Sequence, residues 1–541
     1  HNECDKMMKK SAYIGNKLCV MALLCAAISI SLPVMAASDD QVSTLRIGVS
    51  KIYDKPGFYP SGANRDWTIG IRGLVADQLV QVGTNGEAVP SLAQSWEVKD
   101  DGKTWIFHLQ KNASWHDGKP VTSGDVKFTY EYSRKRSPSS DKFFSEYLDT
   151  IEAPDESTVI FRLKKPFSPF LTWYTLGGET IIPEHIWSKV NPANASESED
   201  MTGSGPFLFE RFDRDRNVLI FKANANYFGE TPKVDRVEVQ MFKGEDTMLM
   251  ALKKGDIDVA THITGSSVPS LSSDADLKVV FTPSLSVKNL WFNLRQYPMN
   301  ITNMRKAFAY AIDYQQLSEA SISGHGEAGG YAPDISPSMY WYNPDAKRYE
   351  RNLSMAESLL NSSGFIDRDG DGVRELPSGG DLKIDLYVPS DDVTYLREAE
   401  LIKGWEDDAG IAVNIKAVDS SSWLDQVFTT KTFNTTTIIT KQIDSPYKSA
   451  VTDIHFVDIP GYRNETFDGL VDALLRESDA DKQKSISFDI QGMMAEDLPG
   501  ISLYSADLID AYRSDRFEGF TAVPGDGLMV RLSILNARAV R

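Results

Sequence analysis

The sequence predicts an α/β protein that folds into more than one lobe. The chain has 541 residues, which is more than one hydrophobic core usually supports. Segments with strand-like alternation and segments with helical spacing follow one another over long stretches, as is typical of α/β lobes. The composition, 41% hydrophobic and 25% charged, is that of an ordinary soluble globular protein.

The predicted elements of the first half centre on a hairpin at 96–109. Two alternating runs flank Asp100-Asp-Gly-Lys, a turn that needs a positive φ at Gly102. Helical spacing covers 70–82, 125–136 and 247–254, and a polar, Ser/Glu-rich stretch at 191–204 predicts a linker. The other predicted strands are 44–50, 157–163, 206–212, 217–223, 234–242 and 257–260.

Helices dominate the predicted second half. One helical block covers 303–321, and another at 356–361 ends at Gly364, a helix C-cap signal. The strands 382–388 and 411–417 then alternate with the helices 393–409 and 420–430. A mostly helical stretch at 466–496 leads into a strand at 500–505.

Residues 1–36 are interpreted as a secretory signal peptide. Lysines precede an apolar run from Leu18 to Leu32, which is too short for a good membrane span, and small residues precede cleavage after Ala36. The alternative is an uncleaved anchor helix. All three cysteines lie in this segment, so we expect a mature, exported protein without disulfides or thiol chemistry, in the periplasm or at the outer face of the cytoplasmic membrane.

Charge and motifs restrict the function. The formal net charge of −19 argues against nucleic acid or an anionic membrane surface as the main partner. The run from Gly324 to Gly329 satisfies G-x-G-x-x-G, but a helix precedes it where a dinucleotide site needs a strand, so we expect a loop. No His-Glu-x-x-His or Gly-x-Ser-x-Gly stretch occurs. We therefore expect no catalytic residues, with an exported hydrolase as the disfavoured alternative.

One acidic loop is a candidate cation site. Asp367, Asp369, Asp371 and Glu375 alternate with other residues so that their carboxylates can converge on one calcium ion. Ser378 stands where a calcium loop normally has its last, bidentate Glu. The expectation is a structural calcium and no required cofactor, and the alternative is a solvated acidic turn.

Several stretches resemble the family 5 extracellular solute-binding proteins of ABC importers, the peptide and nickel group. Residues 92–126, which run from Leu-Ala-Gln-Ser-Trp to Ser-Gly-Asp-Val, resemble that family's signature region. Other landmarks follow in the family's order, at 203–207, 226–235, 251–258, 292–294, 304–313, 356–365 and 496–499. The resemblance covers nearly the whole chain after residue 36.

The resemblance implies a two-lobed fold of the periplasmic-binding-protein type II kind, with an additional domain as in its large cluster C members. Lobe I would comprise 44–68, 203–286 and 500–541. Domain II would comprise 69–202 and lobe III 287–499. Crossing segments near 286–292 and 497–503 would act as the hinge.

The resemblance also implies a function and a site. The chain would capture a small solute, expected to be a di- or oligopeptide, between its lobes, and would deliver it as a monomer to an ABC permease. Alternatives are a nickel or metal-chelate binder, an oligosaccharide binder and a subunit that presents its ligand to a sensor. The residues placed where the family lines its cleft are Tyr53, Tyr59, Trp67, Glu179, Asp444 and Tyr447. Asp444, which lacks the Trp that often precedes it, would hold a ligand ammonium group with help from Glu179.

Overall fold

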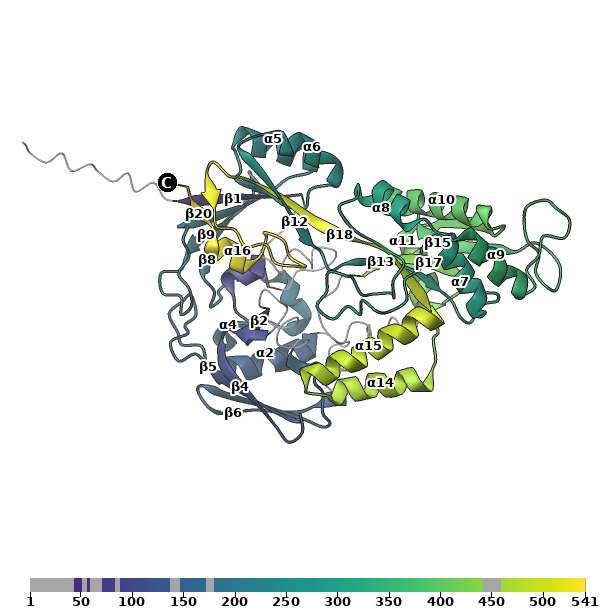
Figure 1. Ribbon diagram of the computed structural model, residues 1–541. Helices are drawn as coiled ribbons and strands as arrows, with labels where there is room; N and C mark the ends of the chain where they lie inside the picture. The colour runs from purple at the N-terminus through teal and green to yellow at the C-terminus, as the bar shows by residue number, and fades with distance from the viewer. Residues whose placement is uncertain are drawn as a thin grey trace, which may run out of the picture. The chain divides into compact units, whose positions relative to one another are not determined.

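The computed structural model describes residues 43–50, 56–58, 71–82, 88–136, 146–171, 180–440 and 459–540. The chain divides into two compact units, His1–Gln41 and Val42–Arg541, and every described residue belongs to the second. Figure 1 shows the arrangement of its helices and strands. No helix in the described ranges is both long and apolar enough to cross a membrane.

A twelve-stranded sheet contains strands from both predicted lobes. Its order is β16-β15-β17-β13-β18-β11-β1-β10-β9-β8, and β12 and β14 also pair with β18. The strands are β1 (Thr44–Val49), β8 (Phe207–Asp213), β9 (Val218–Ala223), β10 (Arg236–Met241), β11 (Val259–Ala260), β12 (Leu277–Pro283), β13 (Val287–Phe292), β14 (Gly326–Ala328), β15 (Lys383–Pro389), β16 (Ala412–Val418), β17 (Thr435–Thr440) and β18 (Gly500–Arg513).

Two long segments cross from one half of this sheet to the other. The first half of β18 pairs antiparallel with β13, and its second half pairs antiparallel with β12. Only residues 284–286 separate β12 from β13, so the second crossing runs beside β18 in the opposite direction. These two antiparallel crossings connect the halves, and Figure 1 shows β18 extending between them.

The range predicted as domain II, 69–202, contains an antiparallel sheet with its own hydrophobic core. The order is β4-β5-β7-β6, and helix α2 (Ser123–Arg136) packs on it. The strands are β4 (Ala93–Lys99), β5 (Thr104–Leu109), β6 (Leu148–Asp155) and β7 (Thr158–Leu163). The predicted hairpin is confirmed, with φ of 54°, 52° and 86° at Asp100, Asp101 and Gly102. The buried aromatic residues of this hydrophobic core include Trp105, Phe107 and Phe161.

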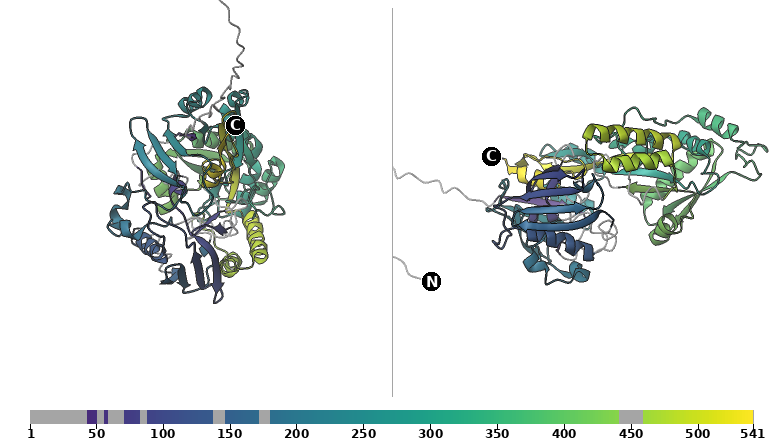
Figure 2. Two further views of the ribbon diagram at one scale, coloured as in Figure 1. Left: turned by 90° about the vertical axis from the view of Figure 1, so that its left-hand side faces the viewer. Right: turned by 90° about the horizontal axis from the view of Figure 1, so that it is seen from below.

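Helices cover the lobe III half of the sheet and extend beside it. They are α7 (Thr302–Ala311), α8 (Tyr314–Ile322), α9 (Leu353–Ser362), α10 (Val393–Asp408), α11 (Ser420–Leu424), α14 (Glu465–Arg476) and α15 (Ala480–Asp497). The core here contains residues from α7, α9, α10, β13, β15 and β18. Figure 2 shows α14 and α15 running side by side.

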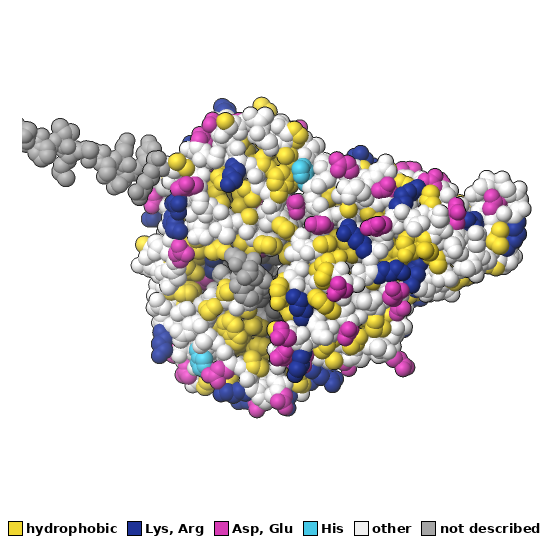
Figure 3. All heavy atoms as spheres, in the orientation of Figure 1, with side chains coloured by type: hydrophobic (Ala, Val, Ile, Leu, Met, Phe, Trp, Pro, Cys, Tyr) yellow, Lys and Arg dark blue, Asp and Glu magenta, His cyan; other side chains and the backbone are white. Residues whose placement is uncertain are grey.

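The remaining helices and short strands lie in lobe I and domain II. The helices are α4 (Glu184–Trp187), η3 (Pro192–Glu197), α5 (Glu245–Lys254), η4 (Gly265–Ser267), α6 (Val268–Ser272) and α16 (Arg531–Asn536). The short strand pairs are β2 (Val80–Val82) with β3 (Ala88–Pro90), and β19 (Phe517–Glu518) with β20 (Arg538–Ala539). On the face shown in Figure 3, basic and acidic side chains are interspersed, as is typical of a solvated surface.

Two predicted helices are wrong in extent, and a third is helical over nearly its predicted range but changes its helix type. The helix predicted at 70–82 covers 71–75, and Val80–Val82 forms β2. The block predicted at 303–321 is two helices, because Ile312 has extended backbone and Asp313 caps α8 by accepting a hydrogen bond from the Gln316 amide at 2.9 Å. The helix predicted at 420–430 is the short α11 followed by a single π-helical turn, η5 (Asp425–Thr429).

The helix of 71–75 stops because tertiary contacts fix the chain directly after it. Asp77 is fully buried and accepts hydrogen bonds from Arg531, from Ser204 Oγ at 2.8 Å and from Tyr227 Oη at 3.0 Å. A Cβ at Gly203 would meet the Val75 carbonyl oxygen at 1.8 Å, so glycine is required there. These contacts outweigh the local helical pattern.

Candidate ligand-binding site

Parallel strands in each half of the large sheet end at a common edge. In lobe I, β1 is parallel to both β10 and β11, and in lobe III, β15 is parallel to both β16 and β17. The six strand ends are Val49, Met241, Ala260, Pro389, Val418 and Thr440. Ligands of open α/β sheets bind outside the carboxyl ends of the strands. These two carboxyl edges are therefore the candidate site.

The predicted ligand contacts adjoin these edges in the sequence but lie outside the described residues. Tyr53, Tyr59 and Trp67 follow β1, and Asp444 and Tyr447 follow β17. The sixth residue, Glu179, directly precedes the first described residue of its segment. Their roles stay predictions, and the described strands define where the chain leaves the sheet to reach them.

A buried polar network fixes the end of β17. The Asn289 side-chain amide donates to Asp334 Oδ1 at 2.7 Å and to Thr440 Oγ1 at 3.0 Å. Thr440 Oγ1 donates to the same Asp334 oxygen at 2.5 Å, and Ser502 Oγ donates to Asn289 Oδ1 at 3.4 Å. All four residues are buried. The network joins β13, β17 and β18, so the residue from which the chain departs toward Asp444 has a fixed position.

A buried ion pair lies on the opposite face of β13. Lys288 Nζ lies 3.1 Å from Glu398 Oε2 and 2.9 Å from the centre of the Tyr395 ring. Tyr504 donates a hydrogen bond to Glu398 Oε1 at 2.6 Å. Burial lowers the pKa of Lys288 to about 8, and the nearby Glu398 carboxylate opposes this shift. The cluster joins β13 and β18 to helix α10 beside the carboxyl edge of lobe III.

Sequence reasoning missed this cluster, although one signal was available. Lys288 is the one charged residue in β13, whose six residues are all buried. A lysine inside an otherwise uncharged and largely apolar strand predicts a buried partner, because an unpaired buried charge is costly. The partner Glu398 carries no comparable signal, because it lies in a helix that contains several other acidic residues.

The lobe I edge is held by a second buried carboxylate. Asp510, on β18, accepts hydrogen bonds from the His262 amide at 3.0 Å and the Leu528 amide at 2.7 Å. Burial raises the pKa of Asp510 to about 6, although both amides oppose the shift. His262 comes two residues after β11 ends, so this contact fixes the loop at the carboxyl edge.

Exposed apolar side chains lie at the lobe III edge. Val393 opens the helix that follows β15 and is 79% exposed, and Ile439, one residue before the end of β17, is 52% exposed. Leu424 and Phe428, in the segment after β16, are also exposed. Apolar residues gathered at the edge of a sheet mark a surface that can contact a ligand or another part of the chain.

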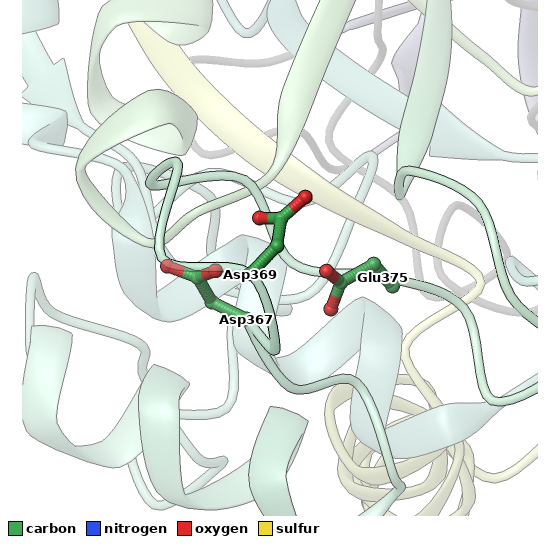
Figure 4. Close-up of side chains that lie close together, drawn as sticks. All are labelled: Asp367, Asp369 and Glu375. Carbon is green, nitrogen blue, oxygen red and sulfur yellow. The ribbon is translucent and has the colours of Figure 1, made fainter.

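The acidic loop brings three of its four carboxylates together. Oxygens of Asp367, Asp369 and Glu375 lie within 4.8 Å of one another, and Asp371 is not in this group. Figure 4 shows these three side chains on the loop. The Asp371 carboxylate accepts instead from the Val373 amide at 2.8 Å.

Backbone amides and the Arg368 side chain also contact the carboxylates of the acidic loop. Asp367 accepts from the Gly370 and Gly372 amides at 2.7 and 3.1 Å. Glu375 accepts from the Arg368 amide at 2.9 Å, and Arg368 Nη1 lies 3.5 Å from it. Carboxylates suit a calcium ion, but the Arg368 guanidinium competes with it. Calcium binding stays a prediction.

Comparison with known proteins places the chain in a family. The model of bacterial extracellular solute-binding proteins, family 5, matches residues 87–448. A probable D,D-dipeptide-binding periplasmic protein, DdpA, of Escherichia coli K12 is 31% identical over 307 residues, which are 54% of this chain and 57% of that protein. The dipeptide-binding protein of the same organism is 27% identical over 305 residues, which are 53% of this chain and 56% of that protein.

The fold is also that of solved structures. A periplasmic oligopeptide-binding protein from Thermotoga maritima has a TM-score of 0.80 at 22% identity, with 93% of this chain and all of that chain covered. This likeness supports the type II binding-protein fold predicted from the sequence. The chain spans a little over half the length of the curated relatives that it matches. It belongs to the bacterial extracellular solute-binding proteins of family 5.

Proposed function

We propose that this chain is the solute-binding subunit of an ABC importer and that it captures a di- or oligopeptide. The observation that carries the proposal is the family match over residues 87–448. The names of the two Escherichia coli relatives, which both refer to dipeptides, support peptide as the ligand class.

Two carboxyl edges connected by paired crossings suit capture by closure. A ligand that contacts both edges binds the closed form more tightly than the open form, and this differential affinity shifts the equilibrium toward closure. The crossing strands β12–β13 and β18 are the segments about which the lobes would rotate. The closed form would then deliver its ligand to a membrane permease.

The peptide would be held by charge at one point and by apolar contact elsewhere. Asp444, with Glu179, would pair with the ligand ammonium, and Tyr53, Tyr59, Trp67 and Tyr447 would provide aromatic walls. Val393 and Ile439 at the lobe III edge add apolar surface for ligand side chains. A metal chelate would instead require cationic or imidazole groups in these positions.

The remaining features follow from this role. The protein would be exported after cleavage of residues 1–36, would act as a monomer in the periplasm or at the outer face of the membrane, and would leave its ligand chemically unchanged.

Mass spectrometry of the small molecule that co-purifies with the protein tests the proposal. The expected result is one or more short peptides released on denaturation. A nickel chelate or an oligosaccharide, with no peptide, would replace the proposed ligand class and keep the fold.

A further inference from the structure

The C-terminal end of α14 contacts domain II at Ser168. The Ser168 amide donates a hydrogen bond to the Leu475 carbonyl oxygen at 2.9 Å. Its hydroxyl also donates toward this oxygen, at 2.9 Å, and toward the Leu474 carbonyl oxygen at 3.0 Å. The two partners are about 300 residues apart in the sequence, and Figure 1 shows α14 beside the antiparallel sheet of domain II.

An apolar contact accompanies these hydrogen bonds. The Leu475 side chain packs against the hydrophobic core of domain II, which contains Phe167 and Phe170, the residues on either side of the Ser168-Pro169 pair. The neighbouring Leu474 is buried with Phe467 and Met494 in a cluster of lobe III, and the Leu475 side chain also packs against this cluster. Leu475, at the end of one helix, thus lies between the cores of two different parts.

The chemistry of a helix end explains why this contact forms. The last carbonyl groups of a helix have no partner within the helix and carry partial negative charge. In α14 the Glu477 amide satisfies the Ala473 and Leu474 carbonyl groups at 3.0 and 3.3 Å. The Leu475 carbonyl accepts from Ser168 instead, so domain II provides part of the C-terminal cap of a lobe III helix.

This contact lies outside the crossing segments. Helix α15 and residues 498–499 connect α14 to β18, and the core that Leu474 joins includes Leu285 and Val287 of the other crossing. Rotation of lobe III about the crossings would carry α14 away from Ser168. The amide and the hydroxyl of Ser168 would then donate to water, and the part of Leu475 that packs against the domain II core would be exposed.

We propose that Ser168 and the end of α14 form a clasp that holds the two lobes closed and sets the population of the open form. The proposal deepens the proposed function and rests on the lobe closure described there. Hydrogen bonds that water can replace contribute little each, so such a clasp biases the equilibrium without locking it. A protein that is already partly closed without ligand binds its ligand more tightly, because less of the binding free energy is needed to drive closure.

Small-angle X-ray scattering of ligand-free mature protein tests the clasp. Leu475→Asp places a charge against the domain II core and should lower the ratio of closed to open forms by about tenfold or more. Its matched control is Ala473→Asp, which adds the same charge at an exposed position of the same helix. Ser168→Ala removes the hydroxyl donor and retains the amide, so its effect should be smaller.

The expected result is a larger radius of gyration for Leu475→Asp, an intermediate value for Ser168→Ala and no change for Ala473→Asp, with unchanged circular dichroism in all three. Equal radii for wild-type protein and Leu475→Asp would overturn the clasp. The measurement uses no ligand, so this outcome leaves the peptide proposal standing. Conversely, a different co-purified ligand would refute the peptide proposal and leave the scattering result unaffected.

Discussion

The ammonium group of Lys288 lies 3.1 Å from the carboxylate of Glu398, and both side chains are buried between the sheet and helix α10. Lys288 is opposite Ile439 on β17 and opposite Tyr504 on β18. The pair therefore sits where the crossing strand meets the strand that leads toward the predicted ligand anchor. Its integrity should matter for the stability of lobe III at this edge.

Removal of one partner of this pair should destabilise the protein strongly. Lys288→Met leaves the Glu398 charge buried without its cation, and such losses typically cost about 3–5 kcal/mol. Lys288→Met with Glu398→Leu removes both charges and should recover most of the loss. Urea denaturation of the two variants and of Glu398→Leu gives the coupling energy. A double variant no more stable than the singles would contradict this account of the pair.

The buried carboxyl of Asp510 should make stability depend on pH. Its pKa rises from 3.8 to about 6 on folding, so between these values the folded protein keeps a proton that the unfolded chain releases. The stabilisation from this proton is complete below about pH 4 and is lost as the pH rises through 6. At about 1.4 kcal/mol per unit of pKa shift, the change is up to about 3 kcal/mol.

The measurement is the free energy of unfolding of wild-type protein and of Asp510→Asn from pH 4 to pH 7. The free energy of unfolding of the wild-type protein should exceed that of the variant by an amount that decreases as the pH rises. Asp489→Asn, an exposed site, serves as the control and should give a constant difference. A constant difference for Asp510→Asn as well would mean that the carboxyl titrates normally.

Calcium should raise the melting temperature if the acidic loop binds it. Asp367, Asp369 and Glu375 supply the carboxylates, and a ligand that binds the folded form alone stabilises it by an amount that grows with the logarithm of its concentration above Kd. In differential scanning fluorimetry, the melting temperatures with calcium and with a chelator should differ for wild-type protein and should be equal for Asp369→Asn. Glu400→Gln, on an exposed part of α10, should behave as wild type. If the wild-type melting curves with calcium and with a chelator are identical, the loop is a solvated acidic turn that binds no calcium.

Asp444→Asn should weaken peptide binding by more than tenfold. Loss of one partner of a desolvated ammonium–carboxylate pair typically costs about 2–5 kcal/mol. Titration calorimetry measures the affinity, and thermal unfolding checks that stability is unchanged. If affinity holds while stability falls, Asp444 caps a turn beside Pro446 instead.

The exported protein should begin near Ala37. The basic, apolar and small-residue order of residues 7–36 predicts cleavage after Ala36. Intact-mass analysis of protein secreted by a bacterial host measures the terminus. A lipidated Cys25, or a retained Leu18–Leu32 stretch, would refute the prediction.

Local patterns predicted those elements that depend on nearby residues. The hairpin at 96–109 was found because its turn chemistry is contained in Asp100-Asp-Gly-Lys, and α9 because Gly364, with φ of 82°, follows its end. The helix predicted at 70–82 failed because Asp77 is fixed by Arg531, which lies more than 450 residues away. No local pattern contains that contact.

The groups that support the candidate site were not predictable from local sequence patterns. The loop predicted at Gly324–Gly329 is wrong in part, because Gly326–Ala328 form the strand β14, which pairs with β18. β14 runs so close to β18 that a Cβ at Gly326 would meet the Ser505 carbonyl oxygen at 2.2 Å. Similarly, the pairing of Lys288 with Glu398 depends on how α10 packs on the sheet, which spacing alone does not reveal.

Titration calorimetry of ligand-free protein with a tripeptide measures directly whether the chain binds a peptide. We expect one binding site for a tripeptide with a free amino terminus, much weaker binding of its N-acetylated form, and recovery of the intact peptide afterwards. Absence of binding by any short peptide, together with binding of nickel–histidine or an oligosaccharide, would contradict the peptide proposal, and cleavage of the peptide would contradict a purely binding role.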